Sequence, residues 1–147
     1  EFLAQYQKYE SKLKLFEVQP AREDPEFLSI VHFLSHTVPC YPEKETNSFT
    51  TSLLGFMERN YATMGREARK AALRALILLR NRNRLSPLTL LRLCFTLFRV
   101  PDKDLRLHAY RYIVNDIQNV NRKRKSEKLN RTLQNELYSV LGDKNNE

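Results

Sequence analysis

Few residues of this 147-residue sequence have the types and spacing that enzyme chemistry needs. His32 and His36 are four positions apart, a spacing that suits zinc, but no H-E-x-x-H pattern, nearby carboxylate or third histidine completes a site. Neither Cys40 nor Cys94 has a positioned base that would activate its thiol. We therefore interpret the histidines as exposed or core-edge side chains and the cysteines as reduced, buried thiols.

The acidic residues indicate no catalytic site either. Asp102 and Asp104 are two positions apart and cannot share a helix face, so they fit better as first-turn charges that interact favourably with a helix dipole. Asp116 lies on a mostly apolar stripe, where a carboxylate more often caps a helix or pairs with an arginine than performs chemistry. His108 is isolated beside apolar neighbours. We expect no enzymatic activity and no cofactor, metal or small-molecule substrate.

Cationic side chains are concentrated in two short segments. The first holds Arg80, Arg82 and Arg84, and the second holds Arg122, Lys123, Arg124, Lys125, Lys128 and Arg131. Such residues neutralise phosphates and release condensed counterions, and the asparagines between them can donate hydrogen bonds to phosphate or sugar oxygens. No helix-turn-helix, zinc-finger, RNP or GXXG pattern accompanies them. The pattern favours binding of structured RNA over base-specific recognition of DNA.

Three other interpretations of the basic segments stay open. The charge can belong to a solvated face that maintains solubility. Lys123, Arg124 and Lys125 resemble a nuclear localisation signal, which accounts for the second segment only. The same surface can also bind an acidic protein instead of RNA.

The composition narrows the class of protein. With 25 Lys and Arg against 17 Asp and Glu, the net charge is +8, and 41% of the residues are hydrophobic, which fits a folded basic domain. No apolar run approaches the roughly 18 residues of a membrane span, and no signal peptide opens the sequence. Three glycines are too few for phosphate-binding loops, and two distant cysteines encode neither a disulfide framework nor a zinc ribbon.

The charge is also polarised along the chain. Residues 1–50 hold five basic and eight acidic side chains, a net charge of −3, whereas residues 59–131 hold nineteen basic and five acidic side chains, a net charge of +14. This asymmetry predicts that one end of the domain faces a polyanion and the other faces a different partner.

Apolar side chains recur at helical spacing along almost the whole chain, so we expect an all-α fold of about seven helices. The stripes span residues 2–16, 27–38, 49–57, 68–79, 88–98, 105–120 and 129–141. The predicted helix starts are Asp24-Pro25, Ser86-Pro87 and Ser126, and the predicted ends are Pro20, Pro39 and Gly142. The helix over 88–98 has leucines on all sides and is the predicted centre of the core.

The helix starts near residues 25, 66 and 102 are regularly spaced, and helix pairs that recur at about 40 residues are typical of HEAT- or armadillo-like α-solenoids. We predict a single solenoid domain over 1–147, with an irregular helical bundle as the alternative. Each basic segment is then the turn inside a pair, fourth helix to fifth and sixth to seventh. Such turns lie on one edge, about 10 Å apart, so the two segments would merge into one basic ridge. The ridge ends at the non-basic turn of residues 39–45.

Several stretches, in their order along the chain, resemble the amino-terminal domain of the Sda family, which is named for severe depolymerisation of actin. They are EFL at 1–3, CYPE at 40–43, LILLRNR at 76–82, LFR at 97–99, and IVNDI followed by KLNRTLQN within 113–135. Gly65-Arg66 departs from the family's Asp-Pro helix start, and residues 122–125 are more densely basic than the family's linker. The family has no motif that names individual binding residues, so the predicted site rests on charge placement.

The resemblance implies a nuclear and nucleolar assembly factor of the large ribosomal subunit. Members of the family are α-helical repeat proteins without known enzymatic activity, which associate with late precursor (pre-60S) particles and are needed for their maturation and nuclear export. They are much longer than this chain, which begins at Glu1 inside a helical pattern and ends abruptly, so we expect a fragment of a longer protein.

Our leading hypothesis is a non-catalytic helical scaffold that binds the pre-60S particle. The basic ridge would face ribosomal RNA, and the amino-terminal end would face ribosomal proteins or other assembly factors. The alternative is a protein–protein adaptor for transport or actin cytoskeleton organisation, whose ridge binds acidic partners.

Overall fold

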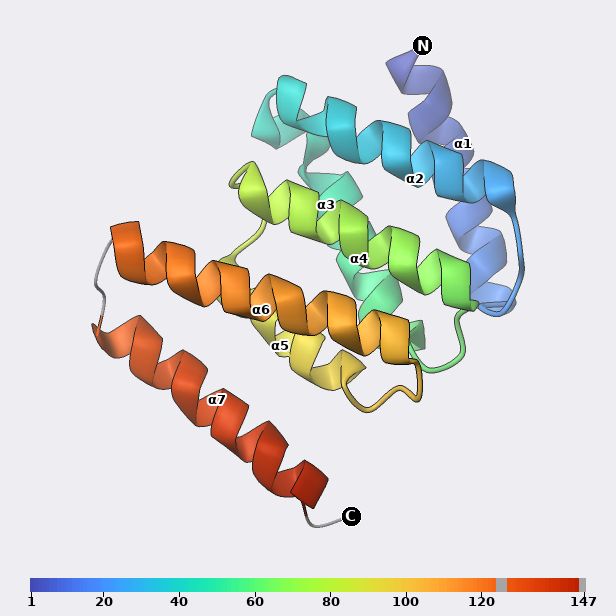
Figure 1. Cartoon of the computed structure of the whole chain (residues 1–147). Coiled ribbons are helices and arrows are strands. Elements are labelled where there is room, and N and C mark those ends of the chain that lie inside the picture. Colours follow the sequence, from blue (N-terminus) through green and yellow to red (C-terminus); the bar gives the residue numbers. More distant parts are fainter. Residues whose placement is uncertain (124–126, 146–147) are drawn as a thin grey trace. The chain divides into compact units, whose positions relative to one another are not determined.

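The structure of the protein is a computed structural model that describes residues 1–123 and 127–145. Within these residues the chain forms seven α-helices, one short 3-10 helix and no β-strand, which confirms the all-α prediction (Figure 1). The elements are α1 (Phe2–Val18), α2 (Pro25–Thr37), η1 (Val38–Cys40), α3 (Glu43–Asn60), α4 (Arg66–Asn81), α5 (Pro87–Leu97), α6 (Lys103–Lys123) and α7 (Glu127–Asn145).

Most helix boundaries follow the predicted capping signals. α2 begins at Pro25, and the Asp24 carboxylate caps it by accepting hydrogen bonds from the backbone N–H groups of Glu26 (3.1 Å) and Phe27 (3.3 Å). One predicted end is wrong, because α7 continues through Gly142 to Asn145. A glycine weakens a helix by only about 1 kcal/mol, which is too little to end it without a proline nearby. Ser126, the predicted cap of α7, lies outside the described residues.

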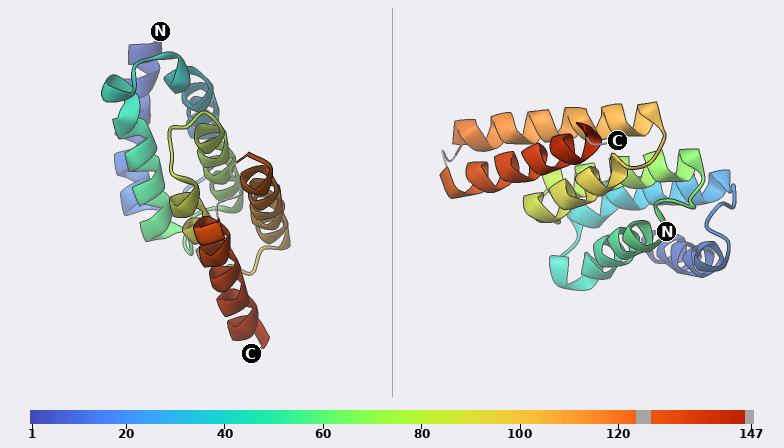
Figure 2. Two further views of the ribbon diagram at one scale, coloured as in Figure 1. Left: turned by 90° about the vertical axis from the view of Figure 1, so that its left-hand side faces the viewer. Right: turned by 90° about the horizontal axis from the view of Figure 1, so that it is seen from below.

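The chain folds as two compact units, Glu1–Ser86 and Pro87–Glu147. In the first unit α1 and α3 form one layer and α2 and α4 form the other, as Figure 2 shows from two sides. α2 packs on α1 and α4, and α3 packs on α4. The helices of this unit therefore pair as α1 with α2 and α3 with α4, one helix earlier than the sequence spacing suggested. They still alternate between two layers, as helices of an α-solenoid do.

An aromatic cluster joins the layers of the first unit. The Phe16 ring of α1 stacks on Phe27 of α2 with ring centroids 4.4 Å apart and meets Phe56 of α3 edge to face at 6.2 Å. Tyr9 of α1 meets Phe49 of α3 edge to face at 4.9 Å. All five side chains are buried. Burial of a large apolar side chain contributes about 1.5–3 kcal/mol, so this cluster determines how α1, α2 and α3 pack.

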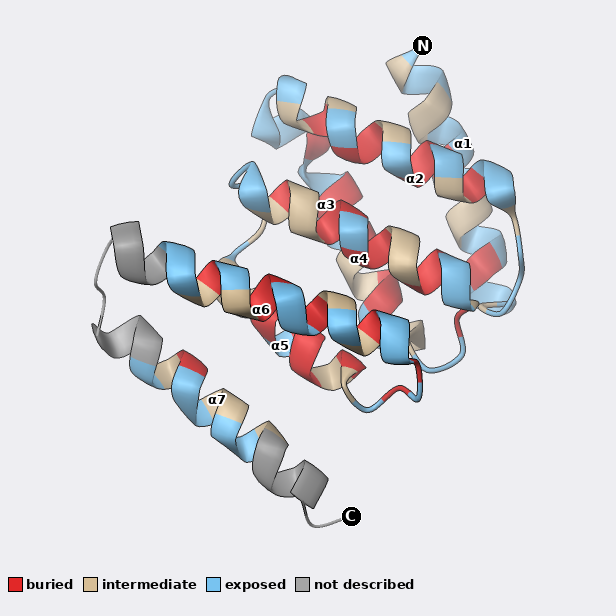
Figure 3. Cartoon of the chain, viewed as in Figure 1, coloured by how far each residue is buried: buried red, intermediate tan, exposed pale blue. Residues whose placement is uncertain are grey.

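One face of α4 carries small apolar side chains, and another face is basic. Ala68, Ala72 and Ala75 are buried, and their short side chains let α2 approach closely. Arg66 and Arg74 are exposed on the other side of the helix, where Figure 3 shows pale blue segments along α4. α4 therefore supports the core with one face and presents positive charge with the other.

In the second unit, α5 packs on α6 and α7 and is buried on most sides, as predicted. Arg92 of α5 pairs with Glu136 of α7 at 3.6 Å. The Asp102 carboxylate caps α6 by accepting a hydrogen bond of 3.2 Å from the backbone N–H of Leu105. Asp102 is thus a helix cap and not a first-turn charge, while Asp104 does lie in the first turn.

Candidate nucleic-acid interface

The first basic segment begins at the carboxyl-terminal turn of α4, which has a defined backbone geometry. The N–H of Arg84 donates to the Leu79 carbonyl (2.8 Å), and the N–H of Asn83 donates to the Arg80 carbonyl (3.0 Å). Asn83 adopts a φ of 62°, in the left-handed region. These features together form a Schellman motif, with asparagine at the position that glycine usually takes. The motif ends α4 and fixes the direction in which the chain leaves it.

The Arg84 side chain connects this turn to an earlier one. Its guanidinium donates hydrogen bonds to the backbone carbonyls of Tyr41 (2.6 Å) and Pro39 (3.2 Å) and to the hydroxyl of Thr46 (3.2 Å). Within the first unit, residues 39–42 and residues 82–86 therefore lie at the same edge. Arg84 satisfies the carbonyls of the earlier turn, which is a structural role.

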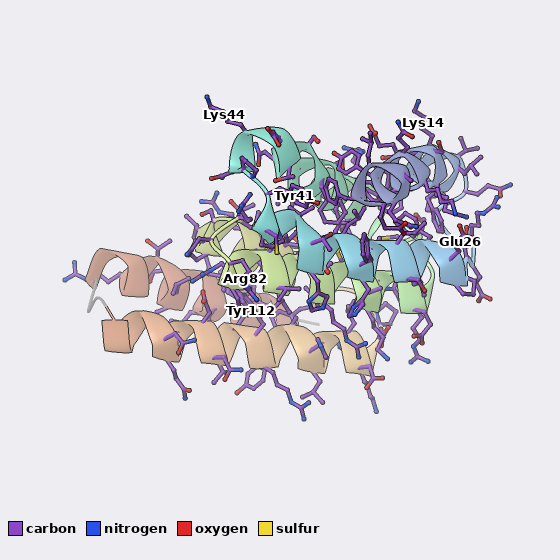
Figure 4. All side chains as sticks on the ribbon, turned by 90° about the horizontal axis from the view of Figure 1, so that it is seen from above. Lys14, Glu26, Tyr41, Lys44, Arg82 and Tyr112 are labelled. Carbon is purple, nitrogen blue, oxygen red and sulfur yellow. The ribbon has the colours of Figure 1, made fainter. Side chains whose placement is uncertain are left out.

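The other two arginines of the first segment differ in exposure. Arg80 is half-buried and has an interaction partner within the chain. Arg82 is exposed and lies at the end of α4, where Figure 4 labels it. Arg82 is therefore the cation of this segment that solvent reaches most freely.

The sequence analysis missed a second group of cations in the same helix. Arg66, Lys70 and Arg74 stand at four-residue intervals, so they follow one side of α4 over two turns. Arg66 and Arg74 are exposed, and Lys70 is half-buried. The spacing itself was the available signal, but the charges were overlooked because they do not form a continuous run.

The second basic segment belongs to the second unit. Arg122 and Lys123 are the last two residues of α6, and Lys128 and Arg131 lie in α7. Arg131 is exposed and has an interaction partner within the chain. Arg124 and Lys125 lie outside the described residues. The prediction that the first segment is the turn inside a helix pair is wrong, because α4 pairs with α3. The merging of both segments into one ridge stays a prediction, because the segments belong to different units.

The side chains considered for catalysis have ordinary structural surroundings. His32 and His36 are exposed and their rings meet edge to face, 4.5 Å apart. No group of three or more His, Cys, Asp and Glu side chains that could hold a metal occurs in the described part of the chain. Burial raises the pKa of Cys94 to about 12, as expected for an unreactive thiol. Cys40 is exposed, so the prediction that both thiols are buried is wrong for this residue.

The polypeptide's architecture defines its class: helices that alternate between two layers and pair with their neighbours form an α-solenoid of the HEAT type. A family model described as SDA1, HEAT repeat, matches residues 33–147. The chain belongs to the SDA1 family. In residues 1–123 and 127–145, no helix has the length and apolar character needed to cross a membrane.

Relatives from distant organisms support this assignment. The chain is 44% identical over 143 residues to the protein SDA1 homolog of Dictyostelium discoideum, and the matched region covers 97% of this chain and 19% of that relative. It is 42% identical over 146 residues to the Drosophila melanogaster homolog, covering 99% and 20% of the two chains, respectively. With the Xenopus tropicalis homolog the identity is 40% over 145 residues, covering 99% and 21%. The chain thus spans about a fifth of the length of these relatives.

Proposed function

We propose that the chain is a non-catalytic scaffold module of a ribosome assembly factor, which docks on the pre-60S particle through its basic ridge. Its partners are then ribosomal RNA, ribosomal proteins and other assembly factors in the nucleus and nucleolus. The proposed role of the whole protein is maturation and nuclear export of the large subunit. Membership of the SDA1 family supports this proposal, because the family resemblance implies this role.

The observation that carries the proposal is the position of Arg82. It is exposed directly after α4, on a turn whose backbone is held by the Schellman motif. The backbone of a rigid turn loses little conformational entropy when a side chain on it contacts a phosphate. Residues 59–131, with their net charge of +14, surround this turn in the sequence and add long-range attraction for a polyanion.

The site residues have different roles in this proposal. Arg82, Lys123, Arg124, Lys125, Lys128 and Arg131 contact RNA phosphates, together with Arg122. Arg84 positions the turn through its contacts with Tyr41 and Pro39, and Arg80 supports it from a half-buried position. The RNA interface is thus held by residues that do not themselves need to touch RNA.

A filter-binding titration with structured RNA tests the proposal. The double variant Arg82→Glu, Lys123→Glu should weaken RNA binding by about tenfold or more and reduce the dependence of the affinity on salt, because fewer counterions are released. Lys14→Glu, Lys44→Glu is a matched control with the same change of charge. Figure 4 shows both lysines projecting from α1 and α3, away from α2 and α4. Equal loss in both double variants would indicate a non-specific charge effect and overturn the proposal.

The same titration separates the proposal from the adaptor alternative. Binding of RNA that weakens steeply with salt supports the ribosomal scaffold. Absence of RNA binding even at low salt supports an adaptor for acidic partners in transport or actin cytoskeleton organisation. Co-sedimentation of the variants with purified pre-60S particles then tests the docking step itself.

A further inference from the structure

A groove in the first unit lies between α2 and α4, outside the proposed RNA interface. The two helices run side by side in the same direction (Figure 1), and the groove between them has a volume of about 510 Å³. Its lining residues are Leu28, Ser29, His32, Ser35, His36, Glu67, Lys70, Ala71, Arg74, Ala75 and Leu78. From Glu67 to Leu78 the groove follows three turns of α4, a length of about 16 Å at 1.5 Å per residue.

The groove lies on the side of its helices that does not form the core. In α2, Phe27 belongs to the aromatic cluster and Val31 and Leu34 are buried, whereas His32 and His36 are exposed. In α4 the groove-lining residues are exposed or half-buried apart from Ala75. The groove is therefore an open surface feature of the first unit and not a defect in its core packing.

The floor and the rim of the groove have different chemistry. Leu28, Ala71, Ala75 and Leu78 supply apolar surface, and the two alanines create the space. The hydroxyl of Ser35 donates a hydrogen bond of 2.8 Å to the carbonyl of His32, so this hydroxyl is already used within α2. The floor therefore suits aliphatic side chains of a ligand.

The rim is cationic. Its cations, Lys70 and Arg74, line the α4 side, and the imidazoles of His32 and His36, which meet edge to face, line the α2 side. Glu67 is the single carboxylate among the lining residues. Arg74 forms no ion pair within the described part of the chain, so its guanidinium is available to a ligand. A ligand that matches this rim carries negative charge on the side of its apolar contacts that faces α4.

We propose that the α2–α4 groove binds an amphipathic, acidic segment of a partner protein. A helix of about three turns matches the 16 Å length, and its apolar residues at i, i+4 and i+7 reach the Leu and Ala floor. Its Asp or Glu side chains face Arg74, beside Lys70, which already has an interaction partner within the chain. RNA fits this groove less well, because a phosphate that lies over the apolar floor loses hydration without gaining a polar partner there.

Selection from a displayed library of random 16-residue peptides, with the full chain as bait, tests this proposal. We expect enriched sequences with apolar residues at helical spacing and several Asp or Glu residues. A synthetic peptide of the enriched sequence should bind about tenfold more weakly to Arg74→Glu, which reverses the rim charge, while Lys14→Glu should bind it like wild type. Enrichment of peptides without acidic residues, or binding that Arg74→Glu does not weaken, would overturn the proposal.

A second variant separates the floor from the rim. Ala71→Trp fills the groove without changing its charge. This variant should also weaken peptide binding by about tenfold, because the indole occupies the space that the apolar side chains of the peptide need. Circular dichroism checks that both variants keep their helical content. Loss of RNA binding in Arg74→Glu without any peptide binding would assign the groove to RNA and reject the partner segment. The peptide experiment does not use the double variant Arg82→Glu, Lys123→Glu, so this proposal and the proposed RNA interface can fail separately.

Discussion

The guanidinium of Arg84 donates a hydrogen bond of 2.6 Å to the carbonyl of Tyr41, 43 residues earlier in the chain. This contact joins the turn that follows α4 to the turn that precedes α3. Two of the three acceptors of Arg84 are backbone carbonyls, those of Pro39 and Tyr41. A residue that the sequence presents as one member of a basic cluster is thus part of the scaffold.

Replacing Arg84 should therefore destabilise the first unit. Arg84→Ala removes three hydrogen bonds from a charged donor, and we expect a loss of about 1.5 kcal/mol or more in the free energy of unfolding. Arg84→Lys should recover little of this, since an ammonium lacks the planar fork that reaches several acceptors. Urea unfolding measures the change. Arg82→Ala is the control, expected within about 0.5 kcal/mol of wild type; a similar loss in both variants would contradict the role of Arg84.

A second prediction concerns the backbone at Asn83. Its φ of 62° lies in a region that costs most L-residues about 1 kcal/mol, and asparagine tolerates it better than β-branched residues do. Asn83→Gly should keep or slightly raise the melting temperature, whereas Asn83→Val should lower it. Asn81→Val, a β-branched substitution at the last residue of α4, is the control for side-chain effects. If valine is tolerated equally at both positions, the Schellman turn is not what fixes this segment.

The sequence predicts those features of the fold and the candidate site that depend on residues close together in the chain, and it misses those that depend on contacts between distant segments. Asp24-Pro25 identified the start of α2 because a cap and a proline act within one turn of the chain. The contacts of Arg84 could not be found in this way, since their acceptors are backbone carbonyls that carry no sequence signal. Asn83 was interpreted as a phosphate donor, although an asparagine directly after a helix is also a common left-handed cap. The layering of α2 beside α4, which creates the groove, required the three-dimensional structure.

The pairing of Lys12 with Asp24 makes stability depend on pH. The Lys12 ammonium lies 2.6 Å from the Asp24 carboxylate, and the two side chains are 21% and 13% exposed. The hydrogen bond from Lys12, followed by that from the Phe27 backbone, lowers the pKa of Asp24. Because the folded pKa lies below the unfolded value of about 3.9, this stabilisation is present above that pH and is lost as the pH falls through the folded pKa.

Asp24→Asn tests this dependence without removing the cap, since asparagine is also a good helix cap. At pH 7 the variant should have an unfolding free energy about 1 kcal/mol below that of wild type. This difference should shrink between pH 5 and pH 2, since each unit by which folding lowers the pKa of Asp24 corresponds to about 1.4 kcal/mol of stability. Glu23→Gln, at the exposed preceding position, is the charge-matched control and should follow wild type. A constant difference between Asp24→Asn and wild type at all pH values would exclude the ion pair as its cause.

The two cysteines should react very differently with a thiol reagent. Cys40 is exposed, whereas Cys94 is buried in α5 and burial raises its pKa to about 12. Because the thiolate is the reactive form and must also be reached by the reagent, Ellman's reagent at pH 8 should label Cys40 within minutes and Cys94 only after unfolding. Cys40→Ser should abolish the fast phase, and Cys94→Ser should leave it unchanged. Rapid labelling of both thiols in the folded protein would mean that α5 opens readily, which its burial on most sides argues against.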